Sequence, residues 1–134
     1  TRAVWLLDQA QTQARAELAT QQGSDLAYVW RNLASAELGL GRVQQALDAI
    51  AKSQAIIAAA DDKVSGPGSM QANAALYAQA QRADLAVPLL ATALASPGIG
   101  FYYSPRMLGI DPVWDPIRDD AGFKSLLKKY AAGD

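Results

Sequence analysis

The sequence predicts an all-α fold in which antiparallel helix pairs stack into a solenoid that short C-terminal helices cap. Three observations support this prediction. Alanine makes up about a fifth of the 134 residues, and β-branched and aromatic residues are sparse, a composition that favours helices. Apolar residues recur three or four positions apart, and short turn-forming stretches separate the segments. One spacing frame occurs twice along the chain, as is typical of stacked helical repeats.

The first expected helix covers residues 2 to about 21. Its apolar positions recur at helical spacing: Ala3, Leu7, Ala10, Ala14 and Leu18. The sequence QGSD follows, in which Gly23 is expected to adopt a left-handed conformation that stops the helix. Ser24 or Asp25 is expected to cap the next helix with its side-chain oxygen.

Four further long helices are expected at about residues 26–39, 42–60, 67–81 and 84–95. Gly41 separates the second helix from the third. Pro67 suits the first turn of the fourth helix, where a missing N–H costs least, and Pro88 is expected near the first turn of the fifth. The whole chain is expected to form one domain with a leading helix, two repeats and a capping tail, at residues 1–22, 26–60, 66–96 and 97–134.

Composition excludes several classes of function. The net charge is −1 and the pI is about 5.3, so the domain lacks the basic field that nucleic-acid binding needs. The chain has neither cysteine nor histidine, which excludes thiolate zinc sites, histidine bases and serine–histidine triads. No apolar run approaches the ~20 residues of a membrane span. We expect no enzyme activity, no cofactor and no binding to nucleic acid or membrane by this domain.

The repeated frame resembles the tetratricopeptide repeat. Its first copy has the spacing W-x2-L-A, a glycine and A-x3-I, and its second copy repeats these positions with changes. The two sets are Trp30, Leu33, Ala34, Gly41, Ala46 and Ile50, then Met70, Asn73, Ala74, Tyr77, Ala86 and Leu90. All except Met70, Asn73 and the glycine are expected to be buried between helices. The second copy has Asn73 in place of the leucine, Gln81 in place of the glycine, and a longer preceding loop.

The end of the chain is similar to the closing segment of a bacterial group of tetratricopeptide-repeat proteins. That segment has a DPxWDPLRDDPRFQxLL-type motif, and here it reads DPVWDPIRDDAGFKSLL from Asp111 to Leu127. In that group such segments commonly follow a winged-helix DNA-binding domain, a serine/threonine kinase domain or a cyclase-like domain. The resemblance implies a C-terminal interaction or regulatory module. Because the chain begins at Thr1 without methionine, we expect a fragment of a longer protein or a processed form.

The four aspartates of this tail raise the question of a metal or catalytic site. Proline follows Asp111 and Asp115, as it follows Ser96 and Ser104, which is the pattern of a capping side chain before the first helical residue. Asp119 or Asp120 is expected to cap a last helix at residues 121–130. The spacing lacks the glycine and glutamate of a calcium loop, so we expect no structural cation. The apolar tail residues are expected to cover the open end of the solenoid: Trp114, Ile117, Phe123, Leu126 and Leu127. Tyr102 and Tyr103 are expected to pack beneath the tail.

The tetratricopeptide resemblance implies a concave groove lined by the first helix of each repeat. The groove candidates are Tyr28, Arg31, Asn32 and Ser35 from one repeat and Gln71, Ala75 and Gln79 from the next. Arg31 and Asn32 occupy the positions where carboxylate-binding members of the family carry a basic residue and an asparagine. A guanidinium binds carboxylate bidentately and an amide can hold an extended backbone, although Arg31 also fits a solvated helix residue.

Two functions follow from these expectations. The first is a non-enzymatic module that binds a peptide or protein segment in the groove, as the C-terminal part of a bacterial regulator. The alternative is a structural or self-association arm of a winged-helix regulator or a serine/threonine kinase, which would form homo-oligomers. The expected compartment is the cytoplasm, or the periplasm where the parent protein has an upstream membrane span.

Overall fold

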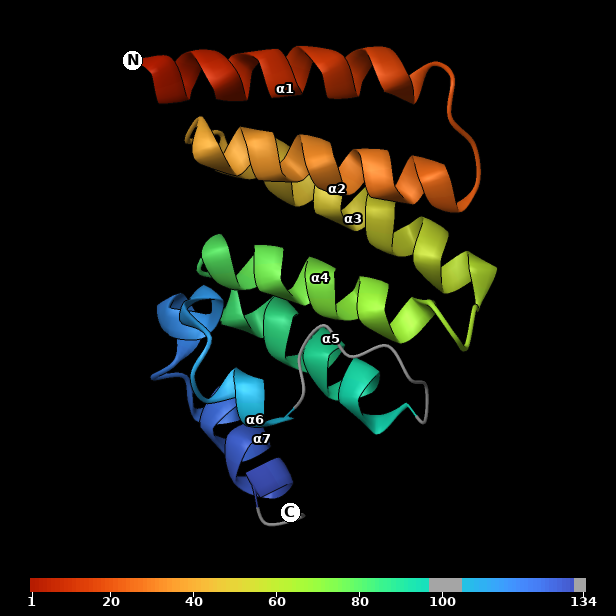
Figure 1. The fold of residues 1–134 in the computed structure, drawn as a ribbon. Helices are drawn as coiled ribbons and strands as arrows, with labels where there is room; N and C mark the ends of the chain where they lie inside the picture. Colours follow the sequence, from red (N-terminus) through yellow and green to blue (C-terminus); the bar gives the residue numbers. More distant parts are fainter. Residues whose placement is uncertain (97–104, 132–134) are drawn as a thin grey trace. The chain divides into compact units, whose positions relative to one another are not determined.

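The fold consists of helices throughout the part of the chain that the computed structural model describes, residues 1–96 and 105–131 (Figure 1). The all-α prediction is therefore confirmed, and the finer solenoid arrangement stays a prediction. Pro97, Tyr102, Tyr103 and Ser104, for which packing or capping was expected, lie outside the described residues. The elements are α1 (Arg2–Leu18), α2 (Ser24–Gly39), α3 (Val43–Ala60), α4 (Gly66–Gln79), α5 (Ala83–Ala95), α6 (Pro105–Leu108), the 3₁₀ helix η1 (Pro112–Ile117) and α7 (Ala121–Ala131).

The chain divides into two compact units, Thr1–Asp61 and Asp62–Asp134. In the first unit α2 packs against both α1 and α3. The contact surfaces are built from small residues, which let helix backbones approach closely, and a few larger aliphatic ones fill the remaining space. The fully or nearly buried positions include Ala27, Ala34, Ala36, Ala46 and Ala49 together with Leu33 and Ile50.

The predicted core positions are buried in both units, with one exception. Leu33, Ala34, Ala46, Ile50, Ala74, Tyr77, Ala86 and Leu90 are each at most 7% exposed. Trp30 is only half-buried. The ammonium of Lys52 on α3 lies 4.4 Å from the centre of its indole ring, so a cation covers part of the aromatic face. The Lys52 side chain thus covers part of an indole ring that was expected to be buried between helices.

The α2–α3 pair and the α4–α5 pair each have the same kind of turn between their two helices. Gly41, between α2 and α3, has φ +78°, and Gln81, between α4 and α5, has φ +60°. In both turns the next residue donates its N–H to a carbonyl five positions back, from Arg42 to Glu37 at 2.8 Å and from Arg82 to Tyr77 at 2.9 Å. Gln81 therefore adopts the left-handed conformation that glycine adopts in the first pair. The second turn therefore has the same conformation with glutamine as the first has with glycine, although a side chain makes this conformation more costly.

Three predicted helix boundaries need correction. α1 ends at Leu18, about three residues early, where the Thr20 hydroxyl donates to the Glu17 carbonyl. α2 begins at Ser24 directly after Gly23, whose φ is +63°, so neither Ser24 nor Asp25 is the cap residue. Pro88 lies inside α5 rather than near its first turn, because that helix begins at Ala83. The helix continues past Pro88, and the Thr92 hydroxyl donates to the Pro88 carbonyl at 3.1 Å.

The loop before α4 is ordered by one aspartate. Asp62 Oδ1 accepts hydrogen bonds from the backbone N–H groups of Val64 at 2.8 Å and Ser65 at 3.1 Å. Because these bonds favour the ionised carboxylate, the pKa of Asp62 lies below its ordinary value. This turn sets the start of α4, whose second residue is Pro67 as predicted.

In the second unit the C-terminal tail packs on the α4–α5 pair. η1 contacts α4, and α7 contacts α5 and α6. Trp114 of η1 and Phe123 of α7 are fully buried, and their rings stack with centroids 5.9 Å apart. Ile117 and Leu126 are also buried, while Leu127 is half-buried. The tail therefore covers the helix pair, as its apolar residues predicted.

The acidic residues of the tail mainly organise its backbone. Asp111 caps η1 by accepting from the Val113 N–H at 2.9 Å, and Asp120 accepts from the Phe123 N–H at 3.0 Å. Asp115 was predicted to be a cap, and this is wrong: it lies within η1 and pairs with Arg118 at 2.8 Å. The Arg118 guanidinium also donates to the carbonyl oxygens of Gly109 and Asp111, each at 2.9 Å. It thereby joins the end of α6 to η1.

We expect Trp114→Ala to lower the free energy of unfolding by about 3–5 kcal/mol, because it leaves a large cavity between η1 and α7. Ile110→Ala, at a position that is 69% exposed, is the control and should change stability by less than about 0.5 kcal/mol. Chemical denaturation followed by circular dichroism gives both values. Equal stability of the two variants would mean that the tail does not stabilise the unit.

The turn at Gln81 gives a second prediction. Gln81→Gly should raise the free energy of unfolding by about 0.5–1 kcal/mol, since glycine adopts positive φ without steric cost. Gln45→Gly, at an exposed position of α3, should instead lower it by up to about 1 kcal/mol. A loss of stability in Gln81→Gly would show that the side chain contributes more than its backbone strain costs.

Candidate functional site

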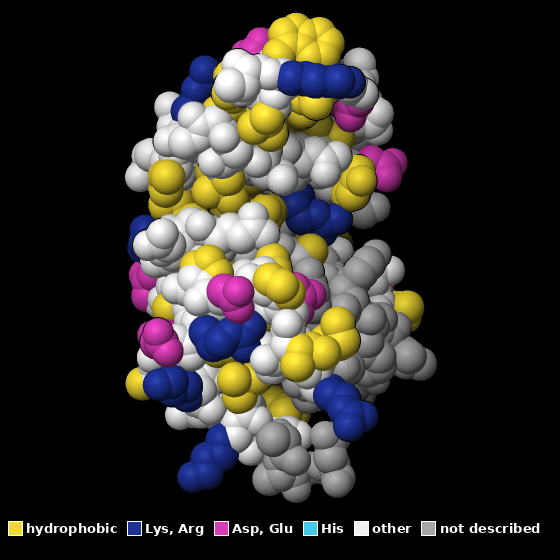
Figure 2. Space-filling view, turned by 60° about the vertical axis from the view of Figure 1, so that its left-hand side comes forward, with side chains coloured by type: hydrophobic (Ala, Val, Ile, Leu, Met, Phe, Trp, Pro, Cys, Tyr) yellow, Lys and Arg dark blue, Asp and Glu magenta, His cyan; other side chains and the backbone are white. Residues whose placement is uncertain are grey.

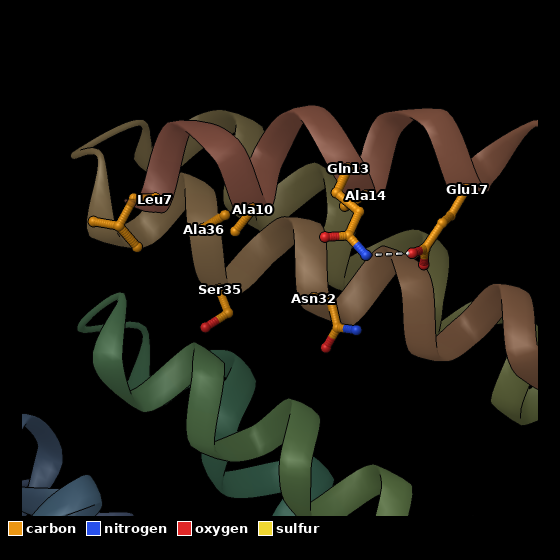
Figure 3. Close-up of a pocket in the computed structure, with 8 residues that line it drawn as sticks. All are labelled: Leu7, Ala10, Gln13, Ala14, Glu17, Asn32, Ser35 and Ala36. Carbon is orange, nitrogen blue, oxygen red and sulfur yellow. Dashed lines mark hydrogen bonds between the residues drawn. The ribbon is translucent and has the colours of Figure 1, made fainter. Parts of the chain in front are cut away.

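A groove lies between α1 and α2 within the first unit. Its volume is about 300 Å³, at the lower end of the range for ligand-binding pockets. Figure 3 shows Leu7 near one end of the row of lining residues and Glu17 at the other. The lining residues are Leu7, Ala10, Gln13, Ala14 and Glu17 from α1, with Asn32, Ser35 and Ala36 from α2.

Small side chains make room for the groove. Ala14 and Ala36 are buried at 5% and 3% exposure, and Ala10 lies beside them with its side chain exposed. At the C-terminal end of α2 the backbone approaches α1 closely: a Cβ atom at Gly39 would lie 2.7 Å from both Cδ atoms of Leu7. Gly39 therefore lets Leu7 pack over the end of α2, and Leu7 forms the apolar end of the groove.

The polar side chains of the groove come from both helices. Gln13 Nε2 donates to Glu17 Oε1 at 3.0 Å, as their spacing of four residues on one helix allows (Figure 3). Within the described part of the chain, Oε2 of Glu17 accepts no hydrogen bond. Asn32 and Ser35 are exposed on α2 and offer an amide and a hydroxyl. This set can donate to and accept from a bound backbone, and it contains one carboxylate.

A buried carboxylate fixes α1 against α2. The Glu37 side chain of α2 is 1% exposed. Its Oε1 accepts from Gln11 Nε2 at 2.6 Å and from the Arg15 guanidinium at 3.0 Å, both on α1. Its Oε2 lies 3.6 Å from the guanidinium of Arg42, which follows α2. A buried charge needs such partners, so Glu37 joins three segments and fixes the helix contact that shapes the groove.

The structure places the predicted groove residues differently from one another. Asn32 and Ser35 line the groove. Tyr28 is 55% exposed, and the Arg31 guanidinium lies 5.1 Å from the centre of its ring; neither residue lines the groove.

The remaining candidates belong to the second unit. There Gln71 is buried at 2% exposure and Ala75 at 5%, while Gln79 is exposed at the end of α4. Their place in a groove shared with α2 stays a prediction.

Sequence reasoning missed the contribution of α1. The repeat frame begins on α2, so Gln13 and Glu17 received no role. The sequence does place Gln13 and Glu17 four residues apart on one helix, a spacing that brings the two side chains together on one face. The sequence also places Glu37 three and four residues after Ala34 and Leu33, on the stripe of α2 that is buried. A charged residue at such a position needs a buried partner.

The chain matches no protein-family model, and neither a curated protein nor a solved structure is significantly similar to it. The tetratricopeptide resemblance therefore stays a prediction. Within residues 1–96 and 105–131, no three acidic side chains gather closely enough to hold a metal ion, and none of the helices is long and apolar enough to span a membrane.

The Glu37 cluster gives a prediction about the first unit. Gln11→Met removes the closest donor of a buried carboxylate, so the free energy of unfolding should fall by about 1.5–3 kcal/mol. Gln9→Met, at an exposed position of the same helix, is the matched control and should be close to neutral. If both variants have the same stability, the Gln11–Glu37 hydrogen bond does not hold α1 in place.

Proposed function

We propose that this chain is a non-enzymatic protein–protein interaction module that binds a peptide or an extended protein segment in a helical groove. The observation that supports this most is the groove between α1 and α2, which combines a small-residue floor with amide and hydroxyl groups. An extended peptide presents unpaired N–H and C=O groups along its length. Asn32 supplies both a donor and an acceptor for them, and so does Ser35.

The composition of the groove supports binding rather than catalysis. Its only ionisable side chain is Glu17, and the chain has no histidine or cysteine to act beside it. On the described residues of the face in Figure 2, acidic and basic side chains are interspersed and form no extended basic field. This distribution favours a protein partner over nucleic acid.

The resemblance of the sequence to tetratricopeptide proteins adds a biological setting to this proposal. The repeated turn at Gly41 and Gln81 and the packed DPVWDPIRDD tail are consistent with two helix pairs closed by a cap. On this basis the module would form the C-terminal part of a bacterial regulator, where it would recruit a partner for another domain.

Self-association is the second candidate function, because the first turn of α1 exposes large apolar side chains. Val4, Trp5 and Leu6 are 51%, 59% and 51% exposed, and hydrophobic side chains are visible at the top of the view in Figure 2, where α1 lies. Such a patch can join two copies. Light scattering over a range of protein concentrations separates the functions: a peptide-binding monomer supports the first, and a dimer that Trp5→Ser disrupts supports the second.

The peptide-binding proposal predicts a role for Asn32. In a panel of fluorescein-labelled hexapeptides measured by anisotropy, the tightest binders should lose about tenfold in affinity on Asn32→Ala, because the amide no longer holds their backbone. Gln45→Ala, at an exposed position of α3 outside the groove, should retain the affinity of the unmodified chain. Binding that is equal in both variants, or absent for the whole panel, would contradict the proposal.

A further inference from the structure

The charged side chain of the α1–α2 groove is acidic. Arg31, for which the sequence left open a carboxylate contact or a solvated helix position, lies over the ring of Tyr28 and does not line this groove. Arg15 of α1 donates to Glu37 and does not line the groove either. Of the eight lining residues only Glu17 is charged. The groove therefore attracts a cationic group rather than an anionic one.

The arrangement of the lining residues selects the kind of cation. Leu7, Ala10 and Ala36 form the apolar part of the groove, and Gln13 and Ala14 lie between them and Glu17, as Figure 3 shows. The methylene groups of a lysine side chain can pack against the alanine side chains near Glu17 while the ammonium reaches the carboxylate. Gln13 already occupies Glu17 Oε1, which leaves Oε2 for the ligand. A point charge needs only one oxygen, whereas the bidentate contact of an arginine uses both.

A partner's lysine that enters the groove is expected to have small residues on either side of it in the partner's sequence. The groove has a volume of about 300 Å³, which the lysine stem and a short length of backbone would largely fill. Asn32 and Ser35 lie on α2, opposite the α1 residues that include Glu17. They are placed to bind the peptide groups that flank the lysine.

We propose that the α1–α2 groove binds a lysine side chain presented by an extended segment of a partner protein, with its ammonium on Glu17 and small residues on either side. This inference rests on the proposed peptide-binding function and names its ligand chemistry.

The test uses three short peptides that differ at one position. They are acetyl-Ala-Ala-Lys-Ala-Ala-amide and its counterparts with norleucine or glutamate at the centre; norleucine keeps the methylene chain without the ammonium. The peptides are titrated into the ¹⁵N-labelled full chain, and the side-chain amide signals of Gln13 and Asn32 are followed by NMR. The protein variants are Glu17→Gln and, as a matched control, Asp8→Asn. Asp8 lies on the same helix, is exposed and does not line the groove.

We expect the lysine peptide to shift both amide signals and to bind about five- to tenfold more tightly than the norleucine peptide. Glu17→Gln should abolish this difference, and Asp8→Asn should preserve it. The backbone spectrum of each variant shows that the fold is retained.

The other outcomes distinguish the inference from the proposal beneath it. If the lysine and norleucine peptides bind equally, the lysine inference is wrong while groove binding stands. Tighter binding of the glutamate peptide would also overturn it, in favour of the carboxylate contact that the sequence left open for Arg31. If none of the peptides shifts the groove signals, both the inference and the peptide-binding proposal fail.

Discussion

The first unit depends on the carboxylate of Glu37, which is buried on α2 and must be matched by donors from elsewhere. Two of its donors, Gln11 and Arg15, lie one turn apart on α1, so together they fix both the rotation and the register of that helix. Apolar contacts between alanines are tolerant of sliding, since small side chains interlock weakly. A buried ion with directional hydrogen bonds is much less tolerant, because any shift leaves the charge with fewer donors. The groove between α1 and α2 exists in its present shape because this contact admits one arrangement.

The second unit is stabilised in a different way. Its α4–α5 pair is covered by an aromatic stack, Trp114 on Phe123, and the tail that carries it is held by backbone-directed bonds from Asp111, Asp120 and Arg118. Here the apolar area supplies most of the stabilisation, and the polar side chains determine where each short helix begins. Three of the four tail aspartates, Asp111, Asp115 and Asp120, contact backbone N–H or guanidinium groups of the tail. Asp119 is exposed and makes no such contact in the described residues.

Most of the fold could be predicted from the sequence because its helices are long and periodic. The number of long helices, the core alanines and the capping role of Asp111 and Asp120 all follow from local pattern. The boundary errors concern single residues: Gly23, not Ser24 or Asp25, is the N-cap residue of α2, and Pro88 lies inside α5, which begins one residue earlier than predicted. The sequence placed Gln81 at a repeat position but did not predict its positive φ, which accompanies the hydrogen bond from the Arg82 N–H to the Tyr77 carbonyl. Trp30 was expected to be buried, and the cation that covers it comes from α3, a contact that no local pattern specifies.

The candidate site was less predictable than the fold, for a physical reason. A repeat frame identifies positions on a single helix, and two of the positions that it selected on α2, Asn32 and Ser35, line the α1–α2 groove. The chemical character of a groove is determined by both of its walls, and the second wall is α1, which carries no motif. Glu17 on that wall supplies the only charge, while Arg31 on the predicted wall contacts Tyr28 instead. A guanidinium with an aromatic neighbour on its own helix has a local contact that competes with the groove. The charge of the groove thus depends on which charged side chains have no closer partner. That is determined by helix packing rather than by spacing along the chain.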